Sequence, residues 1–295
     1  MSSSTLFRKV QKLMGNAFEI SVYAHDQKEA DYVLNEAVHE IQRIEALLTT
    51  FNDASQTNKI NQAAGLHPVV VDKEVFDLIK RAQKISILTQ GAFDLSYGSI
   101  DKRLWNFDRE MNSLPDATTA KKMIRLINYE NIILNEQDQS VFLSEKGMRI
   151  GFGGIGKGYA AGDLSAWGYQ ADGNPWTIGI ADPNTKSSFG YLSITNQAVA
   201  TSGNYEKFVT INGKRYSHTI NPKTGMPVTG IKSVTILSPH AEISDALATP
   251  VTVMGTTVGI DLINQLPGIG CVIVDDNNQL FTSKNINLKT QNQYA

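Results

Sequence analysis

Apolar residues recur at helical spacing in two N-terminal segments, residues 31–49 and 72–89. Each segment has an apolar stripe opposite a polar face, which predicts an amphipathic helix packed on a core rather than a cofactor site. Alternation of apolar and polar residues predicts a strand at 16–24, and residues 117–127 predict a third, shorter helix. The first part of the chain is therefore expected to be mainly helical.

Beyond residue 130 the pattern changes to short apolar runs separated by turn-forming Asn, Asp and Gly. Asn212-Gly213 and the run 275–278 predict hairpin turns. Candidate strands lie at 131–134, 141–143, 148–150, 176–180, 191–194, 207–211, 232–237, 270–274 and 279–282. We expect a single α+β unit over residues 1–295, with mainly antiparallel sheet flanked by helices and with residues 1–11 and 286–295 as peripheral tails.

Composition limits the choice of partners. A chain of 295 residues with 41% hydrophobic residues can bury a sizeable core in one large or two smaller domains. Its net charge of -2 gives no reason to expect nucleic acid or an anionic membrane as a partner, so any phosphate site must be local. The single cysteine, Cys271, lies in an apolar run, which favours a buried hydrophobic role over a nucleophile and excludes an internal disulfide.

The segment Gly153 to Gly158 is rich in glycine and contains Lys157. Such backbone can approach a phosphate closely, and a lysine can meet its charge. The same region also satisfies the dinucleotide fingerprint and the first part of a P-loop. The hairpin-rich sequence after residue 170 disfavours a Rossmann domain, and Gly158 stands where a P-loop needs a Ser or Thr for magnesium. Taken alone, a glycine-rich loop of this kind more often forms a tight backbone corner than a phosphate site.

Two later motifs carry candidate chemistry. Asp245 and Thr249 are four residues apart in a helical segment, so their side chains point the same way and offer the oxygen ligands that Mg²⁺ prefers. Pro250 predicts that this helix bends or begins late. His218 ends a predicted strand before the turn-forming residues 221–225, and histidine can share a proton at neutral pH. With the glycine loop, these motifs predict one phosphate and metal site; separately, they also fit a helix cap and an ordinary surface histidine.

The motifs resemble those of the ApbE family of flavin transferases, the FAD:protein FMN transferases. The family patterns run roughly Gly-Gly-Ile-Ala-Lys-Gly-Tyr-Ala, Ser-Gly-(Asp/Asn)-Tyr, His-x-Ile-(Asp/Asn)-Pro-x-Thr-Gly and Ala-Asp-Ala-Leu-Ala-Thr. The second pattern corresponds here to Ser202-Gly203-Asn204-Tyr205, and further matches include Met14-Gly15-Asn16 and Gly91-Ala92-Phe93-Asp94. The resemblance covers about residues 12 to 285 in order and implies a single ApbE-like, T-fold-like unit.

The resemblance also implies roles for particular residues. It implies a site for one or two Mg²⁺ ions formed by Gly154, Asp245 and Thr249. His218, Asp245 and Lys157 are the implied catalytic residues, with His218 or Asp245 accepting a hydroxyl proton and Lys157 assisting at the pyrophosphate. The implied contacts to the flavin nucleotide are Met14, Phe51, Phe93, Asp94, Leu95, Gly151, Lys157 and His218.

The chain departs from the family pattern in three places. Between Ala161 and Trp176 the family normally has an Asp, a helix and a strand that ends in a Gly-Gly-Asp-like turn, whereas here Gly162-Asp163 follows at once. The helix and strand are therefore expected to be missing, which would open one side of the fold beside the glycine loop. Gly151 replaces a common nucleotide-contacting Asp, and Ala248 stands where some members have an acid.

The implied reaction is Mg²⁺-dependent transfer of the FMN moiety of FAD to a Thr or Ser hydroxyl of an acceptor flavoprotein, such as a subunit of a membrane redox complex, with release of AMP. Hydrolysis of FAD to FMN and AMP, and FAD binding without turnover, are the alternatives. Residues 1–14 contain no long apolar segment and no lipidation cysteine, so we expect a cytoplasmic protein; a trimmed N-terminus would instead indicate a periplasmic or membrane-anchored one. The sequence does not identify the acceptor, the oligomeric state or the preference for Mg²⁺ over Mn²⁺.

Overall fold

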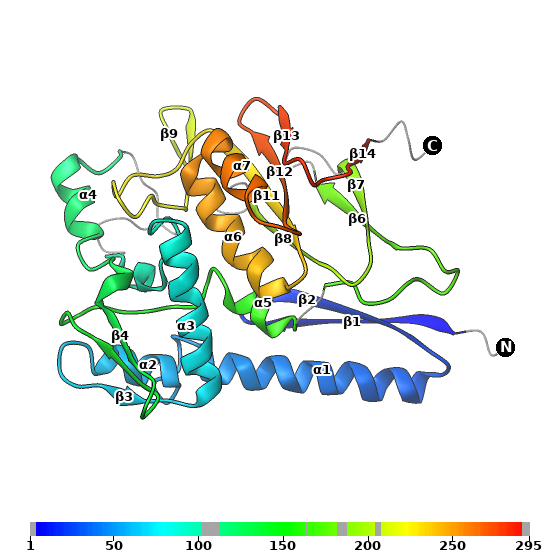
Figure 1. Cartoon of the computed structure of the whole chain (residues 1–295), viewed down its shortest axis with the longest axis horizontal. Helices are drawn as coiled ribbons and strands as arrows, with labels where there is room; N and C mark the ends of the chain where they lie inside the picture. Colours follow the sequence, from blue (N-terminus) through cyan, green and yellow to red (C-terminus); the bar gives the residue numbers. More distant parts are fainter. Residues whose placement is uncertain (1–3, 102–112, 163–164, 182–187, 204–207, 291–295) are drawn as a thin grey trace.

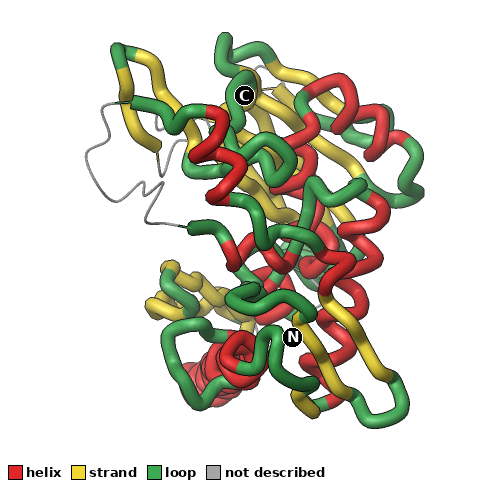
Figure 2. The backbone as a smooth tube through the Cα atoms, turned by 90° about the vertical axis from the view of Figure 1, so that its left-hand side faces the viewer, coloured by secondary structure: helices red, strands yellow, loops and turns green. Residues whose placement is uncertain are grey.

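The structure of the protein is a computed structural model that describes residues 4–101, 113–162, 165–181, 188–203 and 208–290. Three motif residues, Asp163, Asn204 and Tyr205, lie outside the described residues. Helices and strands both occur throughout the molecule, and each strand-rich region has helices packed next to it, as Figure 2 shows. Within the described ranges, no helix is long and apolar enough to cross a membrane.

The described elements follow the predicted division into a more helical first part and a strand-rich second part. The helices, two of them short 3-10 turns (η), are α1 (Gln27–Leu48), α2 (Gln56–Gln62), α3 (Lys73–Leu88), η1 (Leu95–Ser99), α4 (Ala117–Met123), η2 (Tyr129–Asn131), α5 (Gly156–Ala160), α6 (Ala241–Met254) and α7 (Thr256–Asn264). The strands are β1 (Thr5–Leu13), β2 (Asn16–Ala24), β3 (Val69–Val70), β4 (Ile132–Asn135), β5 (Ser140–Leu143), β6 (Trp176–Ala181), β7 (Ser188–Ile194), β8 (Ala198–Gly203), β9 (Phe208–Ile211), β10 (Lys214–Ser217), β11 (Ile231–Ser238), β12 (Gly270–Asp275), β13 (Leu280–Thr282) and β14 (Lys289–Thr290).

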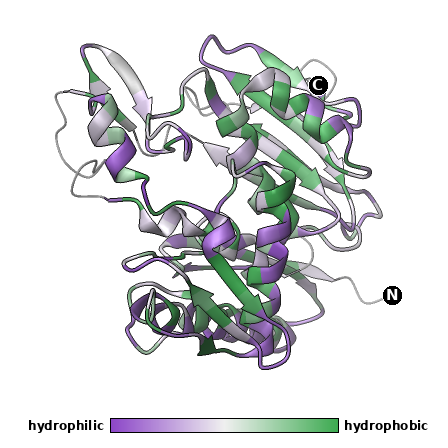
Figure 3. Ribbon diagram, turned by 60° about the vertical axis from the view of Figure 1, so that its left-hand side comes forward, coloured by the Kyte–Doolittle hydropathy of each residue, from purple (hydrophilic) through white to green (hydrophobic). Residues whose placement is uncertain are grey.

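All strand pairs formed by the described residues are antiparallel. The largest sheet has the order β13-β12-β11-β8, and smaller sheets have the orders β14-β7-β6 and β3-β5-β4. Helix α6 packs against β8 and β11, as Figure 1 shows, and the strands of this sheet are coloured mainly as hydrophobic in Figure 3. The predicted fold class, α+β with mainly antiparallel sheet flanked by helices, is confirmed.

Apolar side chains from both parts of the chain meet in one main core. Leu78 and Ile79 of α3, Val234 of β11, Ile273 of β12 and Val251 of α6 are each at most 1% exposed and belong to the same cluster. Burying a large aliphatic side chain stabilises a fold by about 1.5–3 kcal/mol. The main core therefore fixes α3 and α6 relative to the largest sheet, and both helices lead to the candidate site.

Parts of the two segments predicted as peripheral tails form strands. β1 pairs with β2 over its whole length, and the hairpin packs along α1 (Figure 1). Near the C-terminus, Lys289 and Thr290 of β14 pair with Tyr191 and Gly190 of β7. β1 is stabilised by its partner strand, while all its side chains except Leu13 are exposed or half-buried, so its sequence carries little of the apolar alternation that marks a strand.

The predicted strand at 148–150 is also wrong. Met148 and Ile150 are fully buried, which produced the strand-like alternation. The backbone N–H and C=O of Ile150 are instead bonded to the side-chain amide of Asn61, at 2.7 and 3.1 Å. A side chain of α2 thus replaces a neighbouring strand. Helix α6 begins at Ala241 and contains Pro250, so it does not begin late.

Candidate active site

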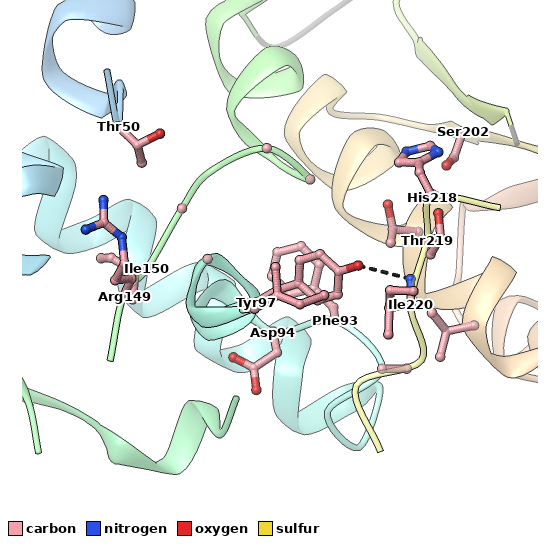
Figure 4. Close-up of a pocket in the computed structure, with 18 of the residues that line it drawn as sticks. Thr50, Phe93, Asp94, Tyr97, Arg149, Ile150, Ser202, His218, Thr219 and Ile220 are labelled. Carbon is pink, nitrogen blue, oxygen red and sulfur yellow. Dashed lines mark hydrogen bonds between the residues drawn. The ribbon is translucent and has the colours of Figure 1, made fainter. Parts of the chain in front are cut away.

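A cavity of about 670 Å³ lies where η1, the glycine loop, the His218 segment and α6 meet. Cavities of this size are typical of sites for cofactor-sized ligands. In Figure 4, Thr50 and Arg149 lie on one side, His218 and Ser202 on the other, and the rings of Phe93 and Tyr97 between them. Seven residues predicted from the sequence line this cavity, namely Phe51, Phe93, Asp94, Gly151, Gly154, His218 and Thr249.

Tyr97 connects the two sides of the cavity. Its hydroxyl accepts a hydrogen bond from the backbone N–H of Ile220 at 3.0 Å, so η1 is tied to the segment that follows β10 and carries His218 (Figure 4). Burial raises the pKa of Tyr97 to about 12, and its phenol therefore stays protonated at neutral pH. Further along, Gly225 has a φ of 71° and its N–H donates to the carbonyl of Asn221 at 2.9 Å, which closes the turn after His218.

Asp94 forms part of the cavity wall and caps η1. Its carboxylate accepts hydrogen bonds from the N–H and hydroxyl of Ser96, at 2.8 and 2.6 Å, and from the N–H of Tyr129 at 2.8 Å. Burial raises its pKa above the ordinary value for aspartate, although these hydrogen bonds oppose the shift. The side chain therefore holds η1 and the segment at Tyr129 together, and this contact positions the wall of the cavity.

The glycine loop approaches α6 closely at Gly158. A Cβ atom on Gly158 would overlap the carbonyl of Ala241 and lie 2.6 Å from Asp245 Cβ, so only glycine permits this contact. The N–H of Gly158 donates to Asp245 Oδ2 at 2.9 Å. At the other end of the loop, a Cβ atom on Gly154 would lie 3.9 Å from Thr249 Oγ1. The loop is thereby fixed against the helix face that carries Asp245 and Thr249.

Lys157 and Asp245 form an ion pair beside the cavity. Lys157 Nζ lies 3.5 Å from Asp245 Oδ1 and donates to the carbonyl of Gly153 at 3.0 Å. The Asp245 side chain is mostly buried, whereas the Lys157 side chain is 40% exposed. Neither side chain lines the cavity. Lys157 belongs to the glycine loop and Asp245 is bonded to it, and Gly153 and Gly154 of the same loop do line the cavity. Lys157 can therefore leave this pair for a ligand phosphate without crossing the core.

The predicted magnesium ligands fit a site that a substrate would complete. Among the described residues, no group of three or more His, Cys, Asp or Glu side chains is placed to hold a metal ion. The predicted set contains instead one carboxylate, one hydroxyl and one backbone carbonyl, from Asp245, Thr249 and Gly154. Mg²⁺ commonly takes one or two protein carboxylates and leaves other positions to water and substrate phosphates. The donor chemistry and the position of Thr249 facing Gly154 thus fit the ion.

Three predicted flavin contacts, Met14, Leu95 and Lys157, are not among the lining residues of this cavity. Leu95 is 2% exposed and belongs to the main core. Met14 packs against the same core, and its backbone N–H donates to Glu45 Oε1 at 2.9 Å. In contrast, Phe51 lines the cavity and is 99% exposed, so its ring is available to a ligand.

Ser202, from the second family motif, also lines the cavity, as do Thr50, Tyr97 and Arg149, which the sequence did not single out. Arg149 brings a guanidinium group to the side opposite His218 and lies 3.4 Å from Asn58 Oδ1 (Figure 4). Asn58 is buried and also donates to the carbonyls of Thr50 and Asn52, so it holds the preceding loop in place. The signal that could have identified Arg149 is its position two residues before Gly151, a predicted flavin contact.

The fold and the cavity define a class of protein. It is an α+β protein with antiparallel sheets, and its cavity is formed by a glycine loop, a segment that carries a histidine, and a helix whose side chains offer oxygen ligands for a metal ion. The model of the ApbE family matches residues 14–161 and 160–273. This match spans most of the chain, and the chain belongs to the ApbE family. The two matched segments meet at residues 160–161, next to the place where the sequence is expected to lack a helix and a strand of the family.

Named relatives and a solved structure agree with this assignment. The chain is 33% identical over 300 residues to an FAD:protein FMN transferase of Klebsiella pneumoniae (strain 342), covering 96% of this chain and 93% of that protein. It is 28% identical over 305 residues to one of Treponema pallidum (strain Nichols), covering 91% and 84% of the two chains. The crystal structure of an ApbE protein from Thermotoga maritima superposes with a TM-score of 0.84 at 27% identity, covering 95% of this chain and 97% of that one.

Proposed function

We propose that this protein is an FAD:protein FMN transferase. It would move the FMN moiety of FAD to a Thr or Ser hydroxyl of an acceptor flavoprotein and release AMP. The observation that carries this proposal is the meeting of the glycine loop, Thr249 and His218 in one cavity, with the Lys157–Asp245 pair against the same loop. The names of the relatives support the choice of FAD as substrate.

The reaction forms one bond and breaks one. The acceptor hydroxyl oxygen attacks the FMN phosphorus, the bridging P–O bond of the pyrophosphate breaks, and AMP leaves with the bridging oxygen. His218 would accept the hydroxyl proton, because it lines the cavity at the end of a segment fixed by Tyr97. Asp245 is the second candidate for this role. Lys157 would assist by meeting charge on the leaving phosphate.

The remaining residues would bind and orient the substrate. The aromatic rings of Phe51 and Phe93 offer flat apolar surfaces to the flavin or adenine ring. Asp245, Thr249 and the carbonyl of Gly154 would hold Mg²⁺. When bound, this ion supplies neutralisation of the negative charge on the pyrophosphate. Arg149 would meet a further acceptor group of the nucleotide on the side opposite His218.

The test is to incubate the purified protein with FAD, Mg²⁺ and a candidate acceptor flavoprotein that carries no flavin. Transfer would give a fluorescent acceptor band on a denaturing gel, an acceptor mass increased by one FMN moiety, and one AMP for each FMN attached. AMP without modified acceptor would instead indicate an FAD pyrophosphatase. Intact FAD retained by the protein would indicate FAD binding without turnover, which the glycine at position 151 favours over hydrolysis.

A further inference from the structure

Strand β8 forms one edge of the largest sheet, and only its first part is covered by described residues. It pairs with β11 on one side. On its other side, the N–H of Val199 donates to Ser165 Oγ at 3.1 Å, and Ser165 Oγ is 3.3 Å from the carbonyl oxygen of Val199. Ala166 forms a bridge with Gln197. Residues 165–166 thus cover β8 up to Val199.

The rest of this edge, at Thr201 and Gly203, presents backbone groups outward. In an antiparallel pair, the backbone groups of alternate residues point toward and away from the partner. Because the groups of Val199 point away from β11, those of Thr201 and Gly203 do so as well. The 2.8 Å contact between the hydroxyls of Thr201 and Thr235 agrees, since residues of a non-hydrogen-bonded pair have close side chains. No described residue bonds the outward groups of these two residues.

This open edge leads into the cavity. Ser202, between Thr201 and Gly203, lines the cavity and lies beside His218 in Figure 4. Residues paired opposite each other on neighbouring strands project to the same face of a sheet. A strand added to this edge would therefore project the residue opposite Ser202 toward the cavity. Its side chain would enter beside His218.

We propose that the edge of β8 at Thr201 and Gly203 binds an extended segment of the acceptor polypeptide as an added β-strand. The segment would present its Thr or Ser hydroxyl opposite Ser202, and so at the cavity. This inference rests on the proposed function, because transfer needs a polypeptide hydroxyl at the pyrophosphate. Main-chain pairing suits such a partner, since it holds an extended segment through its backbone and directs alternate side chains into the site. Continuity of the edge with the cavity favours the acceptor over a second copy of this chain.

The test uses Thr201→Pro, which removes the outward N–H and places a ring in the path of the added strand. Proline is tolerated at edge positions where the N–H is not used by the sheet. The matched control is Thr282→Pro on β13, the opposite edge of the same sheet. Ser283 donates its N–H to Cys271 at 2.9 Å, so the N–H of Thr282 points away from the sheet. Thr201→Pro also removes the hydrogen bond between the hydroxyls of Thr201 and Thr235. Thr235→Ala is the control for this loss, because it removes the same hydrogen bond and leaves the backbone of β8 unchanged.

We expect Thr201→Pro to raise the KM for the acceptor by about tenfold, with kcat and the thermal stabilisation by FAD unchanged. The two controls should keep the wild-type KM. If Thr201→Pro has the wild-type KM while the wild type transfers FMN, only the edge proposal is wrong. If the wild-type protein transfers no FMN, the proposed function fails and the edge proposal fails with it. A wild-type dimer that Thr201→Pro converts to a monomer would show that the edge binds a second copy, which also overturns the proposal.

Amide hydrogen exchange of the wild-type protein tests the same contact without a substitution. The outward amides of Thr201 and Gly203 should exchange more slowly when the acceptor is added, because an added strand bonds them. FAD alone should not produce this protection. Unchanged exchange at both amides in the presence of saturating acceptor would overturn the proposal, even if Thr201→Pro does not fold.

Discussion

Substitution of Gly158 by alanine tests whether the close contact between α5 and α6 builds the site. In an ordinary helix, replacing glycine by alanine stabilises the fold by about 1 kcal/mol. Here the added methyl group would overlap the carbonyl of Ala241 and lie 2.6 Å from Asp245 Cβ, closer than real Cβ contacts allow. One neighbour is a backbone carbonyl of α6 and the other is a Cβ atom fixed by the backbone of the same helix, so neither can rotate away. Gly158→Ala should therefore stabilise the protein if the glycine is uncrowded, and destabilise it if the close contact with α6 is real.

We expect Gly158→Ala to lower the free energy of unfolding by about 1–3 kcal/mol, the usual cost of overpacking. This corresponds to a decrease of about 2–4 °C in melting temperature for each kcal/mol. Separation of α5 from α6 would also break the hydrogen bond from Gly158 to Asp245 and move Gly154 away from Thr249. Loss of FMN transfer should accompany the loss of stability.

The measurement is chemical or thermal denaturation with and without FAD and Mg²⁺. Gly153→Ala is the matched control in the same loop, because a Cβ atom there meets nothing within 4 Å. It should leave the free energy of unfolding within about 0.5 kcal/mol of the wild-type value. If Gly158→Ala is as stable as the wild type or more so, the close contact between the two helices is not what positions the loop.

Three further predictions concern the chemistry. Asp245→Ala should abolish Mg²⁺-stimulated AMP release while the fold persists, because the metal site loses its only carboxylate; a wild-type rate would refute the assignment. His218→Ala should bind FAD nearly normally but transfer FMN about 10²- to 10⁴-fold more slowly. Full transfer activity in that variant would make His218 a structural residue. Thermal stabilisation should be larger with FAD than with ATP or NAD, and a clear preference for NAD would contradict the flavin assignment.

The sequence predicted those parts of the fold whose stability is visible in their own residues. Helices α1 and α3 were found because each buries a long apolar stripe. Strands β11 and β12 were found because both are almost completely buried and each contains a cluster of branched apolar residues. Strand β8 was missed because its sequence, Ala-Val-Ala-Thr-Ser-Gly, consists mostly of small residues and has no strong alternation. Its pairing with β11 determines its structure, and that pairing is not visible locally.

The candidate site was predictable to the extent that its parts lie in motifs. Gly154, His218 and Thr249 come from three distant motifs, and all three line one cavity. Tyr97 could not be found in this way, because its importance depends on its contact with Ile220 across the cavity. Leu95 follows the motif residues Phe93 and Asp94, yet the turn of η1 directs it into the core. Membership of a motif therefore does not determine which side of a short helix faces the ligand.

At position 151 this chain has glycine where the family pattern has Asp, and the structure shows whether packing requires that glycine. The resemblance implies that family members commonly have an Asp here. A Cβ atom on Gly151 would lie 3.9 Å from Gly98 Cα and from Thr50 Cγ2, which is ordinary van der Waals contact, and its N–H is bonded to the carbonyl of Leu95 at 3.0 Å. Packing therefore does not require glycine at this position. Without that carboxylate, no Asp side chain at position 151 competes for the guanidinium of Arg149, which lines the same cavity; under the proposed function, we therefore expect Arg149 to be available to a phosphate of FAD.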